Sequence, residues 1–304
     1  SFFLPIIPTI LLNGGSGIAV GFATNILNRN PLDLIKACIN ELENKRYSEP
    51  KPWYKGFTGS CEKDPTNESA WLLKGTVEVK NTSTISVTEL PPSITYEKYD
   101  KYLIEKEESK HIASYDDNSK SNIDYTIKFK RSDLEKLTAS KKLHKFLKLE
   151  ERQSENLTML DEHGKLKIFD NVSDIIKYFV NFRLKYYDKR KAHLIKTLEE
   201  QLIVLSNKAA FIKAIIDGKL KINNVQKKTI VLWLETANFD EVDGSYSYLL
   251  SMPIHTLTKE KYEELLSLEN DKSKELIYVK GVLPIDMYRK DLLDLKNVIS
   301  KIYK

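Results

Sequence analysis

Two kinds of hydrophobic patterning divide the chain near residue 170. Before that point, short apolar segments alternate with turn-forming residues. After it, apolar residues recur mostly at steps of three, four or seven. A period near 3.5 predicts long helices packed side by side, whereas short mixed segments predict a domain of helices and strands. The pattern therefore predicts an α+β protein, in which a mixed α/β domain precedes a long antiparallel coiled coil.

The first part contains one well-marked helix and several strands. Asn30 precedes Pro31, and apolar residues then follow at helical spacing as far as Leu42, which predicts a helix with Asn30 as its N-cap. The charged stretch 106–124 is predicted to be an exposed loop. Period-two alternation predicts strands and one hairpin, over residues 75–80, 84–90 and 125–130, and over 156–160 with 166–169.

The second part predicts a helix of roughly forty residues that ends near Gly218 and is interrupted at Lys191. Two further helices are expected over 258–282 and 286–302, with Pro284 between them. The segment 218–257 would then form a small helical head at the far end of an antiparallel pair. An ordinary helical bundle fits these helix lengths as well. The predicted domains are residues 1–170, 171–217, 218–257 and 258–304.

Composition narrows the possible functions. The two cysteines, Cys38 and Cys61, and the five scattered histidines show no metal-ligand spacing, so no metal site and no disulfide is expected. The apolar run near the start holds two prolines and has no basic flank, which argues against a signal peptide. Because the sequence starts at Ser1 without a methionine and enters this apolar run at once, a fragment of a longer chain is expected. No other apolar run approaches membrane-spanning length, so no membrane partner is expected.

The net charge of +5 is distributed unevenly. Residues 128–152 hold nine basic and four acidic side chains, with Lys141 and Lys142 adjacent in the middle. Such a segment suits a polyanion, because each neutralised phosphate releases counterions. Charge alone nevertheless favours an ordinary solvated, lysine-rich surface over a binding site.

The glycine-rich stretch LLNGGSGIAVGFATNIL, residues 11–27, resembles a phosphate-binding loop only superficially. A P-loop needs a Gly-Lys-Ser/Thr ending, and the first lysine is Lys36. The dinucleotide fingerprint needs an uninterrupted strand and a third glycine three positions after the second. Here Pro5 and Pro8 break the preceding strand, and Gly21 follows Gly17 one residue late. Both nucleotide interpretations fail on spacing.

The same stretch with its flanks resembles the DNA-cleavage subunit of type IIA DNA topoisomerases, in which LPxxPxLLxNGxxGIAxGxATxI leads into a helix. Further segments resemble that family in the same order along nearly the whole chain. They are KPWYKGFTGS at 51–60, ISVTELP at 85–91, FRLKYYDKRK at 182–191 and YLLSMPIHTLT at 248–258. The PWYKGFTGS and YLLSMPI segments favour the eukaryotic and T-even-phage branch over bacterial gyrase, and FLPIIPTILLNG points to the phage medium subunit.

The resemblance implies a DNA-binding role for the glycine stretch. Residues 1–170 would be the tower, or shoulder, domain, whose glycines let the backbone approach DNA closely. Ile26 matches the family's isoleucine wedge, which kinks the duplex, although Ile26 on its own pattern is a core residue before a helix. Arg29 stands where the family has a proline turn and could contact a phosphate. The residues expected to bind double-stranded DNA are Asn13, Gly14, Gly17, Thr24, Asn25, Ile26, Arg29, Lys141 and Lys142.

The family's chemistry is expected to lie elsewhere. Its catalytic tyrosine follows an arginine upstream of the LPxxP stretch, and Arg46-Tyr47 lies downstream, so it is predicted to be a surface turn. Mg²⁺ and ATP would be used through other domains or through a separate ATPase chain, and this segment alone is expected to be inactive and to bind no cofactor. The location would be the bacterial cytoplasm for a phage protein and the nucleus for a eukaryotic one. The alternatives are a helical scaffold or structural DNA-binding protein and, with no supporting constellation, a nuclease or ligase.

The segment 232–254 is rich in large apolar residues. In the family this region forms the exit gate, a two-fold interface between two copies. The resemblance therefore implies a homodimer, with Tyr248, Leu249 and Met252 as the expected contacts. The competing interpretation places these side chains in the core of the head itself.

Overall fold

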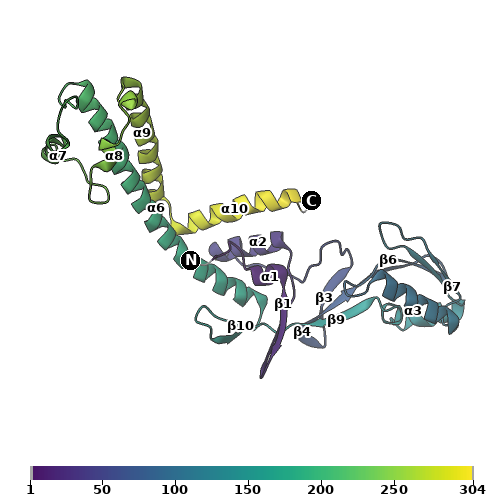
Figure 1. Cartoon of the computed structure of the whole chain (residues 1–304). Coiled ribbons are helices and arrows are strands. Elements are labelled where there is room, and N and C mark those ends of the chain that lie inside the picture. Colours follow the sequence, from purple (N-terminus) through teal and green to yellow (C-terminus); the bar gives the residue numbers. More distant parts are fainter. Residues whose placement is uncertain (1–2, 303–304) are drawn as a thin grey trace. The chain divides into compact units, whose positions relative to one another are not determined.

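The computed structural model describes residues 3–302, which form two compact units. Unit 1 runs up to Asn181 and includes the chain from Asp291 onward, and unit 2 is Phe182–Lys290. The predicted boundary at residue 170 coincides with the start of a long helix, α6 (Val172–Ile216), whereas the units divide inside α6 and inside the last helix, α10 (Pro284–Ile302) (Figure 1). The mixed α and β content agrees with the predicted α+β class.

Unit 1 begins with α1 (Thr9–Asn13) and a hairpin of β1 (Gly15–Ala19) and β2 (Phe22–Ile26), followed by α2 (Pro31–Leu42). The two strands pair antiparallel from Gly15↔Ile26 to Ala19↔Phe22 and form a sheet of their own. The predicted helix is confirmed, because the Asn30 side chain accepts a 2.8 Å hydrogen bond from the Leu32 amide. The glycine stretch is therefore a β-ribbon rather than a loop.

A three-stranded antiparallel sheet follows, with the order β3-β4-β9. Its strands are β3 (Ser60–Asp64), β4 (Asn67–Lys74) and β9 (Glu150–Ser154). The predicted second hairpin is confirmed as β10 (Thr158–Leu160) and β11 (Leu166–Ile168). Strand β9 runs directly into this hairpin, so the segment 154–157 links the sheet to it.

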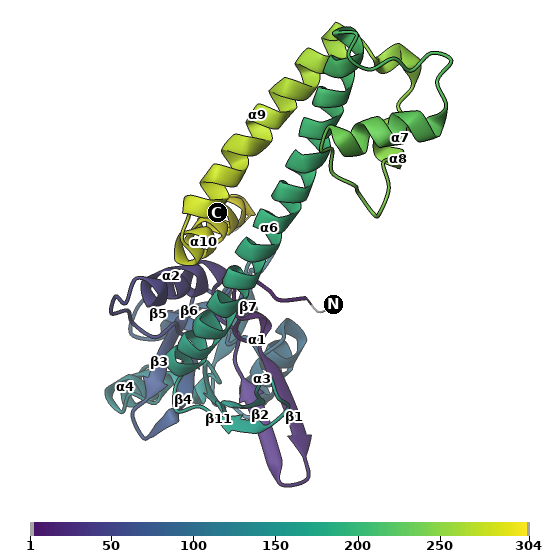
Figure 2. The same cartoon turned by 90° about the vertical axis from the view of Figure 1, so that its left-hand side faces the viewer.

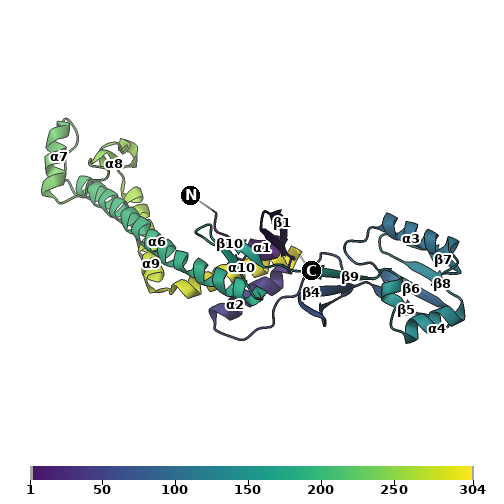
Figure 3. The same ribbon diagram turned by 90° about the horizontal axis from the view of Figure 1, so that it is seen from below.

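The chain between β4 and β9 forms a four-stranded antiparallel sheet with the order β5-β6-β8-β7, packed against three helices (Figure 3). The predicted strands are confirmed as β5 (Thr76–Val79), β6 (Thr84–Glu89) and β8 (Tyr125–Lys128). The exposed loop predicted over 106–124 is wrong in part, because it contains the end of a helix and an edge strand. The remaining elements are α3 (Tyr96–Glu108), β7 (Ser114–Asp117), α4 (Arg131–Ala139) and α5 (Leu143–Phe146).

Unit 2 contains the predicted helical pair. The part of α6 from Phe182 onward lies beside α9 (Lys259–Gly281), and the two run antiparallel (Figures 1 and 2). The predicted interruption at Lys191 is wrong, because α6 is continuous over 45 residues. Its Lys191 ammonium instead donates hydrogen bonds to the carbonyls of Lys280 (2.9 Å) and Val282 (2.8 Å), so a polar residue in the seam caps the C-terminal end of α9.

The helical head between these helices has a core of its own. It comprises α7 (Lys227–Thr236), α8 (Ser247–Leu250) and a 3₁₀ turn, η1 (Ile254–Thr256). Gly218, with φ of 71°, follows the end of α6, as its sequence predicted. The end of α6 contributes to this core, whose buried residues are Phe211 and Ala214 of α6 and Leu220, Ile230, Leu234, Tyr246 and Leu249 of the head.

Candidate nucleic-acid interface

The β1–β2 hairpin projects from unit 1 as an isolated two-stranded ribbon (Figures 1 and 2). Every residue of β1 is exposed. Three large apolar side chains gather at its tip, where Ile18 is 94%, Val20 101% and Phe22 54% exposed. Exposed apolar groups that lie together on a projecting element are typical of a binding surface.

Ile26 is not at this tip. It lies at the opposite end of the hairpin, where its side chain is 3% exposed. The prediction of Ile26 as a wedge is therefore wrong, because a side chain already packed in the protein core cannot enter a base stack. The exposed residues Ile18, Val20 and Phe22 were missed. The GIAVGF pattern could have identified them, since alternation within a glycine-flanked segment is a hairpin signal.

Glycine is required at both ends of the hairpin, because Gly21 in the tip turn has φ of 85° and Gly14 at the opposite end is also in the left-handed region. Gly14 has φ of 67°, and a Cβ built there would lie 2.7 Å from the Ile26 carbonyl oxygen. A Cβ at Gly17 would meet its nearest atom at 3.8 Å, and Gly17 itself is exposed. Asn13 is also exposed, immediately before this turn. Gly14 thus has a structural role, while Asn13 and Gly17 present accessible surface.

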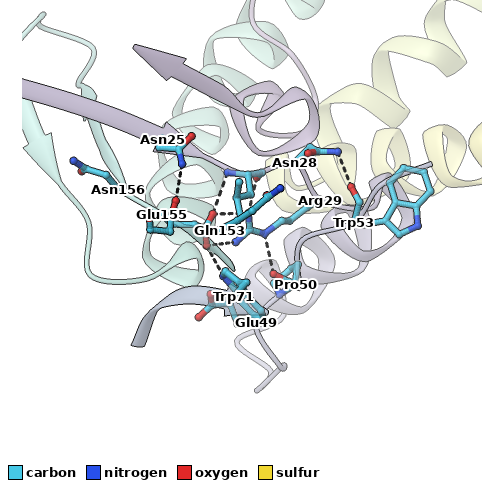
Figure 4. Close-up of polar contacts among 12 residues, drawn as sticks. Asn25, Asn28, Arg29, Glu49, Pro50, Trp53, Trp71, Gln153, Glu155 and Asn156 are labelled. Carbon is cyan, nitrogen blue, oxygen red and sulfur yellow. Dashed lines mark hydrogen bonds and ion pairs between the residues drawn. The ribbon is translucent and has the colours of Figure 1, made fainter. Parts of the chain in front are cut away.

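Thr24 and Asn25 tie the hairpin to the segment after β9. The Asn25 amide donates to the Asn156 carbonyl at 3.0 Å, and the Asn156 amide donates back at 2.9 Å. The Asn25 side chain donates to the Ser154 carbonyl at 2.5 Å, and the Thr24 hydroxyl donates to the Asn156 carbonyl at 3.4 Å (Figure 4). Both predicted residues are only partly exposed, and the contacts of their side chains are internal.

Arg29 is fully buried, so its predicted contact with a phosphate is wrong. Its guanidinium forms a two-pronged ion pair with Glu155, with both N–O distances at 2.7 Å, and its Nε donates to the Pro50 carbonyl at 3.0 Å (Figure 4). Glu155 also accepts hydrogen bonds from the Leu27 amide (3.1 Å) and the Trp71 indole (2.8 Å). Burial alone would raise the pKa of Glu155, but Arg29 and these donors outweigh it and hold the pKa below its usual range.

Lys141 and Lys142 are exposed on the turn between α4 and α5, which belongs to the four-stranded sheet rather than to the hairpin. Within residues 3–302, neither lysine lies within 4 Å of a carboxylate. Two other basic residues of the segment 128–152 form ion pairs, since Arg152 pairs with Asp64 at 2.6 Å and Lys128 with Asp116 at 3.4 Å. The basic segment therefore divides into paired residues and freely accessible ones.

The three predicted interface residues of the head differ in exposure. Leu249 is 1% exposed in the head core, so its side chain is inaccessible to a second copy and the prediction of it as a contact is wrong. Tyr248 and Met252 are partly exposed, and the Tyr248 hydroxyl donates to the Asp240 carbonyl at 2.7 Å. The apolar surface that the head does present includes Leu232, 61% exposed, and Ile254, 77% exposed.

Across residues 3–302, no three or more His, Cys, Asp or Glu side chains are grouped in a way that could hold a metal ion. No helix in that range has the length and hydrophobicity needed to cross a membrane.

Comparison with known proteins agrees with this fold. The family model for the DNA gyrase/topoisomerase IV A-subunit matches residues 1–294. A crystal structure of the DNA-binding, cleavage and re-ligation domain of Plasmodium falciparum topoisomerase II superposes with a TM-score of 0.82 and 30% sequence identity, covering 98% of this chain and 45% of that one. The fold is thus that of a type II topoisomerase cleavage domain.

Sequence relatives point to the same class. The chain is 32% identical over 304 residues to the DNA topoisomerase medium subunit of Enterobacteria phage T4, covering 97% of this chain and 67% of that protein. It is 31% identical over 338 residues to DNA topoisomerase 2 of Plasmodium falciparum, covering 98% of this chain but only 24% of that enzyme. The chain belongs to the DNA gyrase/topoisomerase IV A-subunit family.

Proposed function

We propose that this chain is the part of a type II DNA topoisomerase that binds and bends the duplex to be cut. Family membership supports the enzyme class, and the solved neighbour is a DNA-binding and cleavage domain. The observation that carries the bending role is the apolar tip of the β1–β2 hairpin, with Ile18 and Val20 almost fully exposed. The proposed wedge is therefore the hairpin tip.

Distortion of the duplex and binding of its phosphates are proposed to involve different residues. Inserting an apolar side chain between base pairs costs a few kcal/mol of unstacking, which contacts with bent DNA must offset. Phosphate contacts supply binding that is independent of sequence, and the exposed Lys141 and Lys142 are candidates for them. Asn13 and Gly17 would lie close to the backbone of the duplex at the hairpin.

The remaining steps are proposed to involve groups outside this chain. Strand cleavage, Mg²⁺ and ATP hydrolysis would be supplied by other domains or by a separate ATPase chain, and the segment by itself would be inactive. The head would join two copies of the chain through Tyr248, Met252 and the exposed Leu232 and Ile254. Action on DNA places the protein in the bacterial cytoplasm for a phage source and in the nucleus for a eukaryotic one.

The test uses the assembled enzyme and a duplex labelled at both ends with a fluorophore pair. Ile18→Ala should retain most duplex affinity, measured by anisotropy, while energy transfer reports a smaller bent fraction and less cleavage. Ile203→Ala, an exposed isoleucine on α6 (42% exposed), is the matched control and should change neither quantity. Undiminished bending in Ile18→Ala would refute the wedge, and absence of salt-dependent duplex binding would favour a scaffold.

A further inference from the structure

The β1–β2 hairpin is anchored at the end where Gly15 pairs with Ile26, which is its root, and its tip lies at the opposite end. A two-stranded ribbon is marginally stable by itself, so the position of its tip depends on its root. The hydrogen bonds described above tie the root to three consecutive residues, Ser154, Glu155 and Asn156, more than 125 positions away in sequence. These contacts help to hold the root against any force that a resisting base stack exerts at the tip.

Glu155 is the central contact of the three. Its carboxylate accepts four hydrogen bonds, two from Arg29, one from the Leu27 amide and one from the Trp71 indole. A carboxylate has about four lone-pair sites, so this group is fully engaged. The carboxylate therefore joins the backbone just after β2 to the β4 strand of the three-stranded sheet (Figure 4).

A buried ion pair is a poor means of stabilising a fold. Removing two charges from water costs as much as their attraction returns, and apolar replacements of similar size are often equally or more stable. The pair does fix how its two side chains lie relative to each other, because a two-pronged guanidinium–carboxylate contact sets both distance and orientation. Arg29 and Glu155, at 0% and 5% side-chain exposure, occupy positions where hydrocarbon side chains would suffice for packing alone.

We propose that Glu155 is a positioning residue for DNA bending, which acts through Arg29 and the Leu27 amide to hold the hairpin root while the tip distorts the duplex. This inference rests on the proposed function. It places a bending determinant in the protein interior, with no contact to DNA. Without the carboxylate, the tip should be displaced by the base stack instead of unstacking it, so the DNA is bent less. The surface that contacts the phosphates should stay in place, so the affinity changes little.

The experiment measures bending, affinity and folding in the same assembled enzyme. The double variant Arg29→Met/Glu155→Met leaves no unpaired buried charge and should fold, with a melting temperature below that of the parent because the Leu27 amide and the Trp71 indole lose their acceptor. We expect its bent fraction, by energy transfer, to fall about fivefold while its duplex Kd changes less than about threefold. A purely structural role would lower both together or neither. Arg152→Met removes an ion pair of the same sheet that does not touch the hairpin, and it should leave bending unchanged.

A second variant keeps the inference testable if the double variant fails to fold. Glu155→Asp retains the charge but shortens the side chain, so it cannot reach Arg29 and the Leu27 amide together, and it should also lose bending at nearly constant affinity. Parental bending in either folded variant would overturn the positioning role. A parent enzyme that binds DNA without bending it would instead overturn the proposed function itself, and a loss confined to Ile18→Ala would show that the tip acts without help from Glu155.

Discussion

Leu249 provides the sharpest test of how the head is built. Its side chain is 1% exposed and belongs to the buried cluster that includes Leu234 and Tyr246. Replacing a fully buried leucine by alanine removes its transfer energy and leaves a cavity, at a cost of about 2–5 kcal/mol. For Leu249→Ala we expect a loss of about 3 kcal/mol in the free energy of unfolding of the head, with no direct effect on self-association.

The measurement needs a probe confined to the head. The chain has three tryptophans, and Trp233 packs against the head core, so the fluorine resonance of a 5-fluorotryptophan at that position follows head unfolding alone. The Leu249→Ala midpoint in urea should fall by roughly 2 M if the denaturant slope is about 1.5 kcal/mol/M. Leu232→Ala, exposed on α7, should shift the same resonance by less than about 0.5 kcal/mol in unfolding free energy. If Leu249→Ala unfolds like the parent yet weakens sedimentation as a dimer, the leucine is a contact and the described core is wrong.

Three further predictions address separate features. Lys191→Met should cost the coiled coil about 1–2 kcal/mol in thermal or urea unfolding, because two carbonyls at the end of α9 lose their donor, whereas Lys196→Met should cost under about 0.5 kcal/mol. Gly14→Ala should cost unit 1 more than about 1 kcal/mol in urea unfolding, since φ is positive and a carbonyl blocks the methyl, while Gly17→Ala should be tolerated. The pKa of Glu155 is depressed by folding, so its contribution is complete above about pH 5 and is lost as the pH falls below about 4.3. In an acid titration of stability, Glu155→Gln should lack this part of the loss. The glycine prediction would be contradicted if Gly14→Ala were as stable as Gly17→Ala. The lysine prediction would be contradicted if Lys191→Met lost no more stability than Lys196→Met.

Local patterns allowed the sequence to predict much of the fold. The α2 helix was predicted correctly because its cap, Asn30, and its first-turn Pro31 act within a few residues of one another. The long helices of unit 2 followed from their period. Helix α3 was missed because only Tyr99, Tyr102 and Leu103 of its thirteen residues are buried and the rest is charged. Thr95 at its N-cap position was the available signal.

The candidate site was harder to predict, since the environment of each residue depends on distant parts of the chain. Ile26 and Arg29 sit beside a glycine turn, where sequence alone permits exposure. Both are buried, and the partner of Arg29 is Glu155, 126 residues away, a pairing that no local periodicity encodes. Lys191 was misread for a related reason, since a polar residue in an apolar seam is ambiguous until its partners on the returning helix are known.

The Arg29–Glu155 pair also constrains how this family can vary in sequence. Removing one member of a buried ion pair costs about 3–5 kcal/mol, a large share of the roughly 5–15 kcal/mol that keeps a domain folded, whereas replacing both can be neutral. A substitution at only one of the two positions should therefore give a poorly folded protein. Among relatives of this chain, the two positions should covary, with arginine facing an acid or with two uncharged residues, and mismatched combinations should be rare.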